Sequence, residues 1–192
     1  MLENITRIIE GCIKKDHKCQ QVVYENYRGY ALKIVFRYIY RYEKATDVMN
    51  DGFVKLFNNF ERFTPGKDDE SNGKILMAFL KRIMINTSID ELRKKKLVPE
   101  IGGIPEYVWD VTHKGHDADQ LLLYKDIIIM VKELPPQYRM VFNLYVIDGY
   151  NHLEIADMLN ISPSASKSTL SRARGLLQKS INKSEEKRVC RI

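Results

Sequence analysis

The sequence has few cysteines, no long apolar run and no secretory signal, and each absence excludes a class of protein. Three of the 192 residues are cysteine, and an odd count without a signal peptide argues against a secreted, disulfide-stabilised domain. No apolar run, including residues 127–131, approaches the roughly 18–20 residues of a membrane-spanning helix. The N-terminal segment is amphipathic and carries acidic residues, unlike a secretory signal. We therefore expect a cytoplasmic protein.

Motifs of catalysis are also missing. The sequence has no triad spacing, no glycine-rich phosphate loop and no metal cluster. Cys12, His17 and Cys19 are close in sequence, but no fourth ligand follows at zinc-finger spacing, so we interpret the thiols as buried or idle. We interpret His152, like the other histidines, as a surface residue. The protein is predicted not to be an enzyme, and we expect no cofactor and no small-molecule substrate.

Glycine is sparse, with 10 residues, and apolar residues recur mostly at helical spacing, so we predict an all-α fold. In the first lobe, helices are expected over residues 2–13, from Asp16 to about residue 39, from Thr46–Asp47 to about residue 60, and from about residue 75 to residue 95. Asp16 is expected to cap the second of these helices. The polar segment 64–73 is predicted to be a loop.

Composition changes after the fourth helix. Residues 97–120 hold five acids against one base, together with two prolines and three glycines, and show no clear periodicity. A stretch of this kind is typical of a linker, although an ordered surface loop is the alternative. The expected organisation is two small helical domains joined by an irregular acidic linker: residues 1–97, linker 98–120, residues 121–184 and a tail at 185–192.

The second lobe carries strong helix-boundary signals. Helices are expected over residues 120–134 and from Pro136 to Gly149. A third helix opens at Asn151, with Glu154 completing a capping box. A fourth is capped by Ser162 and has Pro163 at its first position. Two short helices joined by so brief a turn predict a helix-turn-helix in the C-terminal domain.

No acidic residue occurs between residues 160 and 184, although the chain carries 25 acids and a net charge of +6. An acid would repel phosphate, so the absence indicates a polyanion partner. In the last helix Leu170, Ala173 and Leu177 share an inward face with Ser166, which is expected either to bond a nearby carbonyl or to leave that contact weak. The outward and flanking residues, expected to contact DNA, are Ser164, Lys167, Ser168, Ser171, Arg172 and Arg174. The alternative is a basic helix face that only meets solvent.

The fourth helix of the first lobe carries a second candidate surface. Phe79, Arg82, Asn86, Asp90 and Arg93 follow at steps of three, four, four and three, and therefore share one face. An aromatic ring, cations and an amide in one row suit displaced bases and their phosphates. Asp90 is expected to orient Arg93 or Lys94. The alternative is a core phenylalanine beside a solvated charged face.

Two parts of the chain resemble one known family. Residues 134–136 (LPP), 154–156 (EIA) and 171–174 (SRAR) resemble the C-terminal promoter-binding domain of extracytoplasmic-function sigma factors. Residues 47–53 (DVMNDGF) are similar to the segment of that family that docks on the polymerase clamp. Residues 79–93 resemble its promoter-melting helix, with Phe79 in place of the usual tryptophan. Gly52 replaces the usual alanine, which lowers helix propensity by up to about 1 kcal/mol.

The resemblance implies a dissociable initiation subunit that binds core RNA polymerase and promoter DNA, and is itself held by an anti-sigma factor. It assigns upstream-element recognition to the helix-turn-helix and passes the acidic linker through the polymerase. The residues that it implies for the clamp are Asp47, Asn50, Asp51, Lys55 and Leu56. For the minus-ten element it implies Phe63, Phe79, Arg82, Asn86, Asp90, Arg93 and Lys94, with the 64–73 loop and Phe63 forming a pocket for a flipped base.

A stand-alone helix-turn-helix repressor or activator is the main alternative. Its first lobe would sense a ligand or form a dimer, and the chain alone would bind duplex DNA tightly. An enzyme with an incidental basic helix is the third possibility. Co-elution with core RNA polymerase separates the sigma factor from both.

Overall fold

The computed structural model describes residues 4–95 and 128–189, and all regular structure in these ranges is helical. This confirms the all-α prediction. The chain divides into two compact units, Met1–His113 and Lys114–Ile192, which are described separately. The whole of the predicted linker, residues 98–120, lies outside the described ranges. Within those ranges, no helix combines the length and the apolar content needed to cross a bilayer.

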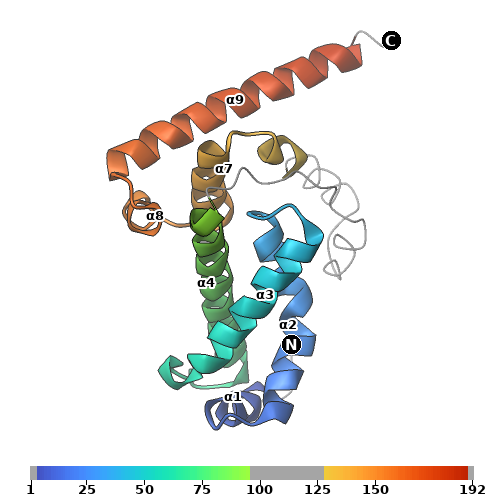
Figure 1. Cartoon of the computed structure of the whole chain (residues 1–192), viewed down its shortest axis with the longest axis vertical. Coiled ribbons are helices and arrows are strands. Elements are labelled where there is room, and N and C mark those ends of the chain that lie inside the picture. Colours follow the sequence, from blue (N-terminus) through green and yellow to red (C-terminus); the bar gives the residue numbers. More distant parts are fainter. Residues whose placement is uncertain (1–3, 96–127, 190–192) are drawn as a thin grey trace. The chain divides into compact units, whose positions relative to one another are not determined.

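The first unit is built on α1 (Ile5–Ile13), α2 (His17–Phe36), α3 (Tyr42–Asn58) and α4 (Asp69–Lys95), with a 3-10 turn, η1 (Phe60–Arg62), after α3. Helices α2, α3 and α4 lie side by side and pack against one another (Figure 1). Their fully buried side chains include Ile34, Leu56, Leu80 and Met84. The apolar spacing seen in the sequence therefore faces one shared core.

Two helix starts in this unit show how local polar groups act. Asp16 caps α2 as predicted, because its carboxylate accepts a hydrogen bond from the Lys18 amide at 2.9 Å. The start predicted at Thr46–Asp47 is wrong, since α3 begins at Tyr42. The Thr46 hydroxyl donates to the Tyr42 carbonyl at 3.0 Å. Thr46 thus bonds back to the preceding turn inside the helix instead of capping it.

Helix α4 also begins earlier than predicted, at Asp69, so the polar loop is limited to residues 64–68. Its first turn is closed reciprocally by Asp68 and Ser71. The Ser71 amide donates to the Asp68 carboxylate at 2.7 Å, and the Asp68 amide donates to the Ser71 hydroxyl at 3.1 Å. This pairing resembles a capping box, and it turns a stretch of polar, loop-like composition into helix.

A buried polar network fixes the 64–68 loop to α1 and α4. Asn72 is fully buried; its amide donates to the Thr6 hydroxyl at 2.9 Å, and its oxygen accepts the Gly66 amide at 2.7 Å. The Thr6 hydroxyl and amide both donate to the Asp69 carboxylate. These bonds from Thr6 hold the pKa of Asp69 below its usual value. The loop is therefore held in place by Asn72 of α4, which is in turn bonded to Thr6 of α1.

Gly52 marks the close approach of α3 to α4. It is buried, and a Cβ placed on it would lie 2.5 Å from the Met84 sulfur. Met84 is itself fully buried. The propensity argument from the sequence applies to an isolated helix, whereas here the missing side chain makes room for a methionine from the facing helix.

The described thiols are not poised for metal binding. Cys12 is fully buried, and burial raises its pKa to about 12. The Cys19 thiol donates to the Asp16 carboxylate at 3.4 Å. Among the described residues, no group of three or more His, Cys, Asp and Glu side chains is placed to hold a metal ion. Cys190 lies outside the described residues.

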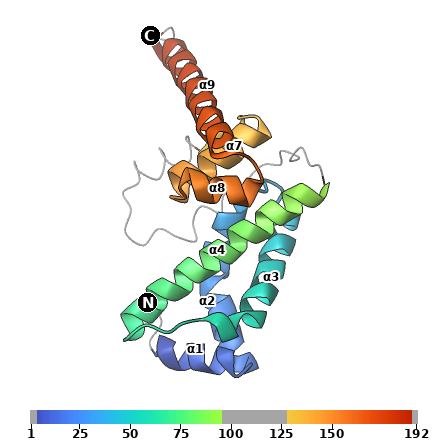
Figure 2. The same ribbon diagram turned by 90° about the vertical axis from the view of Figure 1, so that its left-hand side faces the viewer.

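The second unit contains α7 (Pro136–Phe142), a π-helical turn η2 (Asn143–Ile147), α8 (His152–Leu159) and α9 (Pro163–Val189). The helix predicted over residues 120–134 is described only from residue 128 and ends at residue 132. Figure 2 shows α7 and α8 against the N-terminal part of α9, which extends beyond them. Helix α9 continues to Val189, past the predicted domain end at residue 184.

The predicted helix-turn-helix is confirmed. Asn151 and Glu154 form the expected capping box at the start of α8. Asn160 ends α8 in the left-handed conformation, with φ of 54°. The Ser162 hydroxyl accepts a hydrogen bond from the Ala165 amide at 3.1 Å and so caps α9. The turn between the helices is residues 160–162, and Ala156 is buried where they meet.

Candidate nucleic-acid interface

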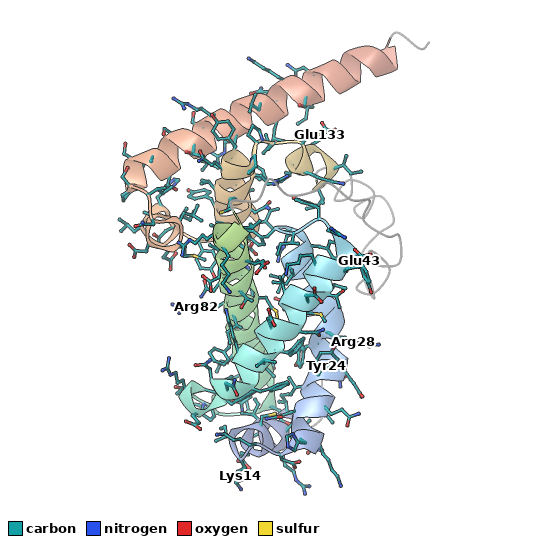
Figure 3. All side chains as sticks on the ribbon, viewed as in Figure 1. Lys14, Tyr24, Arg28, Glu43, Arg82 and Glu133 are labelled. Carbon is teal, nitrogen blue, oxygen red and sulfur yellow. The ribbon has the colours of Figure 1, made fainter. Side chains whose placement is uncertain are left out.

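A cavity of about 260 Å³ opens between the C-terminal end of α3 and the middle of α4. It is lined from both helices and from η1, and Figure 3 shows Arg82 projecting from α4. The lining residues are Lys55, Asn59, Arg62, Phe79, Arg82, Ile83, Asn86 and Thr87. Three members of the predicted row on α4, namely Phe79, Arg82 and Asn86, are thus brought together in one site.

The chemistry of this cavity suits a nucleotide. Lys55, Arg62 and Arg82 supply positive charge, while Asn59 and Asn86 supply amides that both donate and accept hydrogen bonds. The lining side chains, all within the described residues, include no carboxylate. A volume of about 260 Å³ lies just below the roughly 300–1,000 Å³ of drug-sized ligand pockets. It fits a single base better than a large metabolite.

Lys55, one of the lining residues, forms an ion pair with Asp90. The Lys55 ammonium lies 3.3 Å from the Asp90 carboxylate, and the Arg93 guanidinium lies 4.0 Å from the other Asp90 oxygen. Asp90 therefore orients cations, as predicted for Arg93. Lys55, which the resemblance assigned to the clamp, is exposed and also lines the cavity. Arg93 and Lys94 are exposed beyond it, near the end of α4.

Aromatic rings support the cavity from behind. Phe79 is half-buried, and the Phe63 ring meets it edge-on with centroids 5.9 Å apart. Phe63 is only 6% exposed and also packs on Phe60. Phe63 is therefore part of the core and does not line this cavity, and the pocket predicted for Phe63 and the 64–73 loop stays a prediction. The surface offered to a ligand is that of Phe79.

Sequence reasoning missed two polar residues of this site, Asn59 and Arg62. Together with Lys55 they follow at steps of four and three along the end of α3 and η1. That spacing places the three residues on one face of a continuous helix, so the sequence did contain a signal for them. The signal crosses the boundary between α3 and the 3-10 turn η1.

The outer face of α3 carries the other predicted surface of this unit. Asp47, Asn50 and Asp51 are exposed. Tyr24 reaches across from α2 (Figure 3), and its hydroxyl donates to the Asn50 side chain at 3.1 Å. The assignment of Leu56 to this surface is wrong, because Leu56 is fully buried. Val54 is 59% exposed and is the apolar residue of α3 that a partner can reach.

The outward side of α9 has the predicted character. Leu170 and Ala173 are buried against the rest of the unit, as expected of the inward face. Ser168 donates to the Ala165 carbonyl at 3.0 Å, which leaves its oxygen able to accept a bond from a ligand. The exposed side chains of this surface are Ser164, Lys167, Ser168, Ser171, Arg172 and Arg174.

Ser166 finds a partner that the sequence did not predict. It is fully buried, and its hydroxyl shares a 2.9 Å hydrogen bond with Nδ1 of His152 instead of bonding a carbonyl. His152, expected as a plain surface residue, is only partly exposed and stacks on Tyr145, with ring centroids 4.5 Å apart and planes 24° apart. The Arg174 guanidinium carbon lies 5.8 Å from the centroid of the Tyr145 ring.

Comparison with known families matches both units. The model for Sigma-70 region 2 matches residues 23–98, which include α2, α3 and α4. The model for Sigma-70 region 4 matches residues 125–177, which include the helix-turn-helix. The cavity thus lies in the region 2 match, and the exposed basic face of α9 lies in the region 4 match.

Two curated relatives come from Bacillus subtilis (strain 168). The ECF RNA polymerase sigma factor SigW is 24% identical over 197 residues, which cover 92% of this chain and 96% of SigW. The RNA polymerase sigma factor SigZ is 28% identical over 135 residues, covering 68% of this chain and 71% of SigZ. Among solved structures, CnrH in complex with the cytosolic domain of CnrY aligns with a TM-score of 0.48 and 18% identity, over 91% of this chain and 95% of that one.

Both sigma-70 regions are matched in this one chain, and the match to SigW covers 96% of that protein. The repressor alternative is not favoured, because it accounts for the second unit alone. The chain belongs to the sigma-70 family, in its extracytoplasmic-function group, and is a sigma factor that directs RNA polymerase to promoters.

Proposed function

We propose that the first unit of this sigma factor binds core RNA polymerase and the displaced promoter strand, and that the second unit recognises the upstream element as duplex. The observation that carries the proposal is the cavity beside Phe79, where cations and amides meet an accessible aromatic surface. Duplex recognition alone needs no such site. Strand opening does need one, because an unpaired base must be held.

The cavity receives a base of the minus-ten element after it leaves the stack. Extrusion costs a few kcal/mol, and stacking on an aromatic ring returns about 1–3 kcal/mol per base. Phe79 supplies the ring, Asn86 and Asn59 can bond the base edges, and Arg82 and Arg62 face the phosphates. Exposed Arg93 and Lys94 continue the basic track along α4.

The outer face of α3 holds the polymerase clamp. Asp47, Asn50 and Asp51 present polar groups along one side of the helix, and Val54 adds an apolar contact one turn further on. These four residues follow at helical steps of three, one and three, so they form one continuous strip. Exposed Lys55 adjoins this strip and also lines the cavity, whereas Leu56 is excluded from it because it is buried in the core.

Helix α9 enters the major groove of the minus-thirty-five element. Short hydroxyls at Ser164, Ser168 and Ser171 permit close approach, and Lys167 and Arg172 can reach guanine acceptors. The acidic segment 98–120 follows the nucleic-acid channels of the polymerase, for which its net negative charge is suited. We further propose a cytoplasmic protein that acts by binding alone and is held inactive by an anti-sigma factor.

The first experiment is reconstitution with core RNA polymerase. We expect the purified chain to co-elute with the core enzyme in gel filtration, and the complex to give specific run-off transcripts from a genomic fragment library. Tight duplex binding by the chain alone, without co-elution, would contradict the assignment of roles to the first unit.

Asn86→Ala is expected to slow promoter opening while sparing polymerase binding. Asn86 is exposed and lines the cavity, so its loss removes about 0.5–1.5 kcal/mol of hydrogen bonding to the displaced base and little folding free energy. Permanganate footprinting of the holoenzyme measures opening, and gel filtration measures assembly. A premelted promoter should rescue the variant. Weaker assembly, with normal opening once excess core enzyme drives assembly to completion, would place Asn86 on the clamp.

Arg172→Ala is expected to weaken binding to the upstream element by about 1–3 kcal/mol and to relax base preference at one position. Arg172 is exposed on the outward side of α9 and is not among the buried packing residues. Selection of promoters from a randomised minus-thirty-five library measures the change. Lys179→Ala, on the same helix beyond the expected contact, is the matched control. An unaltered preference removes Arg172 from the recognition surface.

A further inference from the structure

A series of contacts between side chains begins and ends on α9. Ser166 bonds His152 at the first position of α8, His152 stacks on Tyr145 of η2, and Tyr145 lies under the Arg174 guanidinium. The distance of 5.8 Å between the Arg174 carbon and the ring centroid is within the range of a cation–π contact. Three helical elements are therefore joined through four side chains, and the last of the four is a predicted DNA ligand.

We propose that Tyr145 is a positioning residue for Arg174, and that Arg174 binds a backbone phosphate of the upstream element instead of a base edge. This rests on the proposed function, in which α9 binds duplex DNA. Residues near the start of a recognition helix contact the bases. Arg174 lies about three turns into α9, and its side chain is drawn toward η2. That position flanks the groove.

Each side chain in this series of contacts restrains the orientation of the next. Ser166 is fully buried, so its hydroxyl requires a partner, and His152 provides it. The bond sets the plane of the imidazole, which the Tyr145 ring follows within 24°. Tyr145 is itself only partly exposed, whereas Arg174 is exposed. A buried anchor thus leads step by step to a cation that faces solvent.

This series of contacts strengthens DNA binding by pre-organising the Arg174 side chain. A free arginine must give up much rotamer freedom when it binds, and that ordering lowers affinity by about three- to tenfold. Stacking on Tyr145 restricts Arg174 before DNA arrives. Because a phosphate contact holds no sequence information, Tyr145 should alter affinity uniformly across promoters, while the base preferences set by Lys167 and Arg172 stay the same.

The test uses holoenzyme assembled from the full chain, and a labelled promoter duplex recovered by run-off selection, with Kd measured over a range of salt concentrations. Tyr145→Leu should weaken binding about three- to tenfold with an unchanged salt slope, and Tyr145→Phe, which keeps the ring, should bind like the unaltered chain. Arg174→Gln should reduce the salt slope by about 1. In that background Tyr145→Leu should have no further effect.

The double variant separates positioning from packing. If Tyr145→Leu weakens binding equally with and without Arg174, Tyr145 acts only on the fold and the proposal is overturned. A changed base preference in Arg174→Gln, with the salt slope unaltered, overturns the phosphate assignment. If Lys167→Ala and Arg174→Gln both leave binding unchanged, α9 does not bind the duplex, and the proposed function of this helix fails together with the inference.

Discussion

Leu56→Ala will destabilise the first unit by about 2–5 kcal/mol, the usual cost of truncating a fully buried leucine. Leu56 is 0% exposed, so the substitution leaves a cavity in the core between the helices. Val54→Asp, two residues earlier on the same helix, should change the free energy of unfolding by less than about 0.5 kcal/mol. Valine and aspartate have similar helix propensity, and this side chain is 59% exposed.

The two variants should separate again in assembly. Val54→Asp places a charge where we propose contact with the clamp, so it should lower affinity for core RNA polymerase although the protein stays folded. Leu56→Ala should lose binding only to the extent that the unit unfolds, and cooling should restore it. Chemical denaturation gives the stability, and a fluorescence competition assay gives the affinity. Normal stability of Leu56→Ala with weakened core binding would return Leu56 to the surface.

Phe79→Ala is expected to reduce open-complex formation by roughly 5- to 150-fold, which corresponds to the loss of about 1–3 kcal/mol of base stacking. The ring is half-buried and borders the cavity, so it is the only aromatic among the lining side chains of the described residues able to stack on a base. Closed-complex formation should be unaffected, because we propose that the duplex is recognised through α9. Stopped-flow fluorescence of a labelled minus-ten base measures the opening step.

Phe79→Trp is the matched control for that experiment. Tryptophan keeps an aromatic face and should retain opening, whereas Phe79→Leu keeps apolar bulk without a ring and should behave like the alanine variant. If leucine supports opening as well as phenylalanine, the contribution of Phe79 is packing on Phe63 at 5.9 Å and stacking on the base is disproved.

Boundaries set by neighbouring residues were predictable from the sequence. Asn160 is a residue type that tolerates the left-handed conformation, and the capping box of Asn151 and Glu154 and the Ser162 cap depend on side chains that bond backbone two or three residues away. The same holds for Asp16. Because both groups of each such hydrogen bond lie within a few residues of each other, the helix-turn-helix of the second unit could be predicted from the sequence.

Other errors arose where the partner is distant in sequence. The resemblance assigned Leu56 to the clamp surface, yet the packing of α3 on α4 buries it in the core. Asp69 and Asn72, predicted in a loop, lie in α4, where both bond Thr6. Ser166 bonds His152 across two helices. None of these pairings follows from spacing along a single element, since each depends on how helices rotate about one another.

The brief turn between α8 and α9 constrains how this protein can acquire new promoter preferences. Asn160 is left-handed and Ser162 caps α9, so the turn 160–162 contains no spare residue. Adding one residue there would rotate α9 by about 100° about its axis and carry Lys167 from the groove side toward the flank. New promoter preferences can therefore arise through substitutions on the outward face of α9, but not through insertions or deletions at the turn.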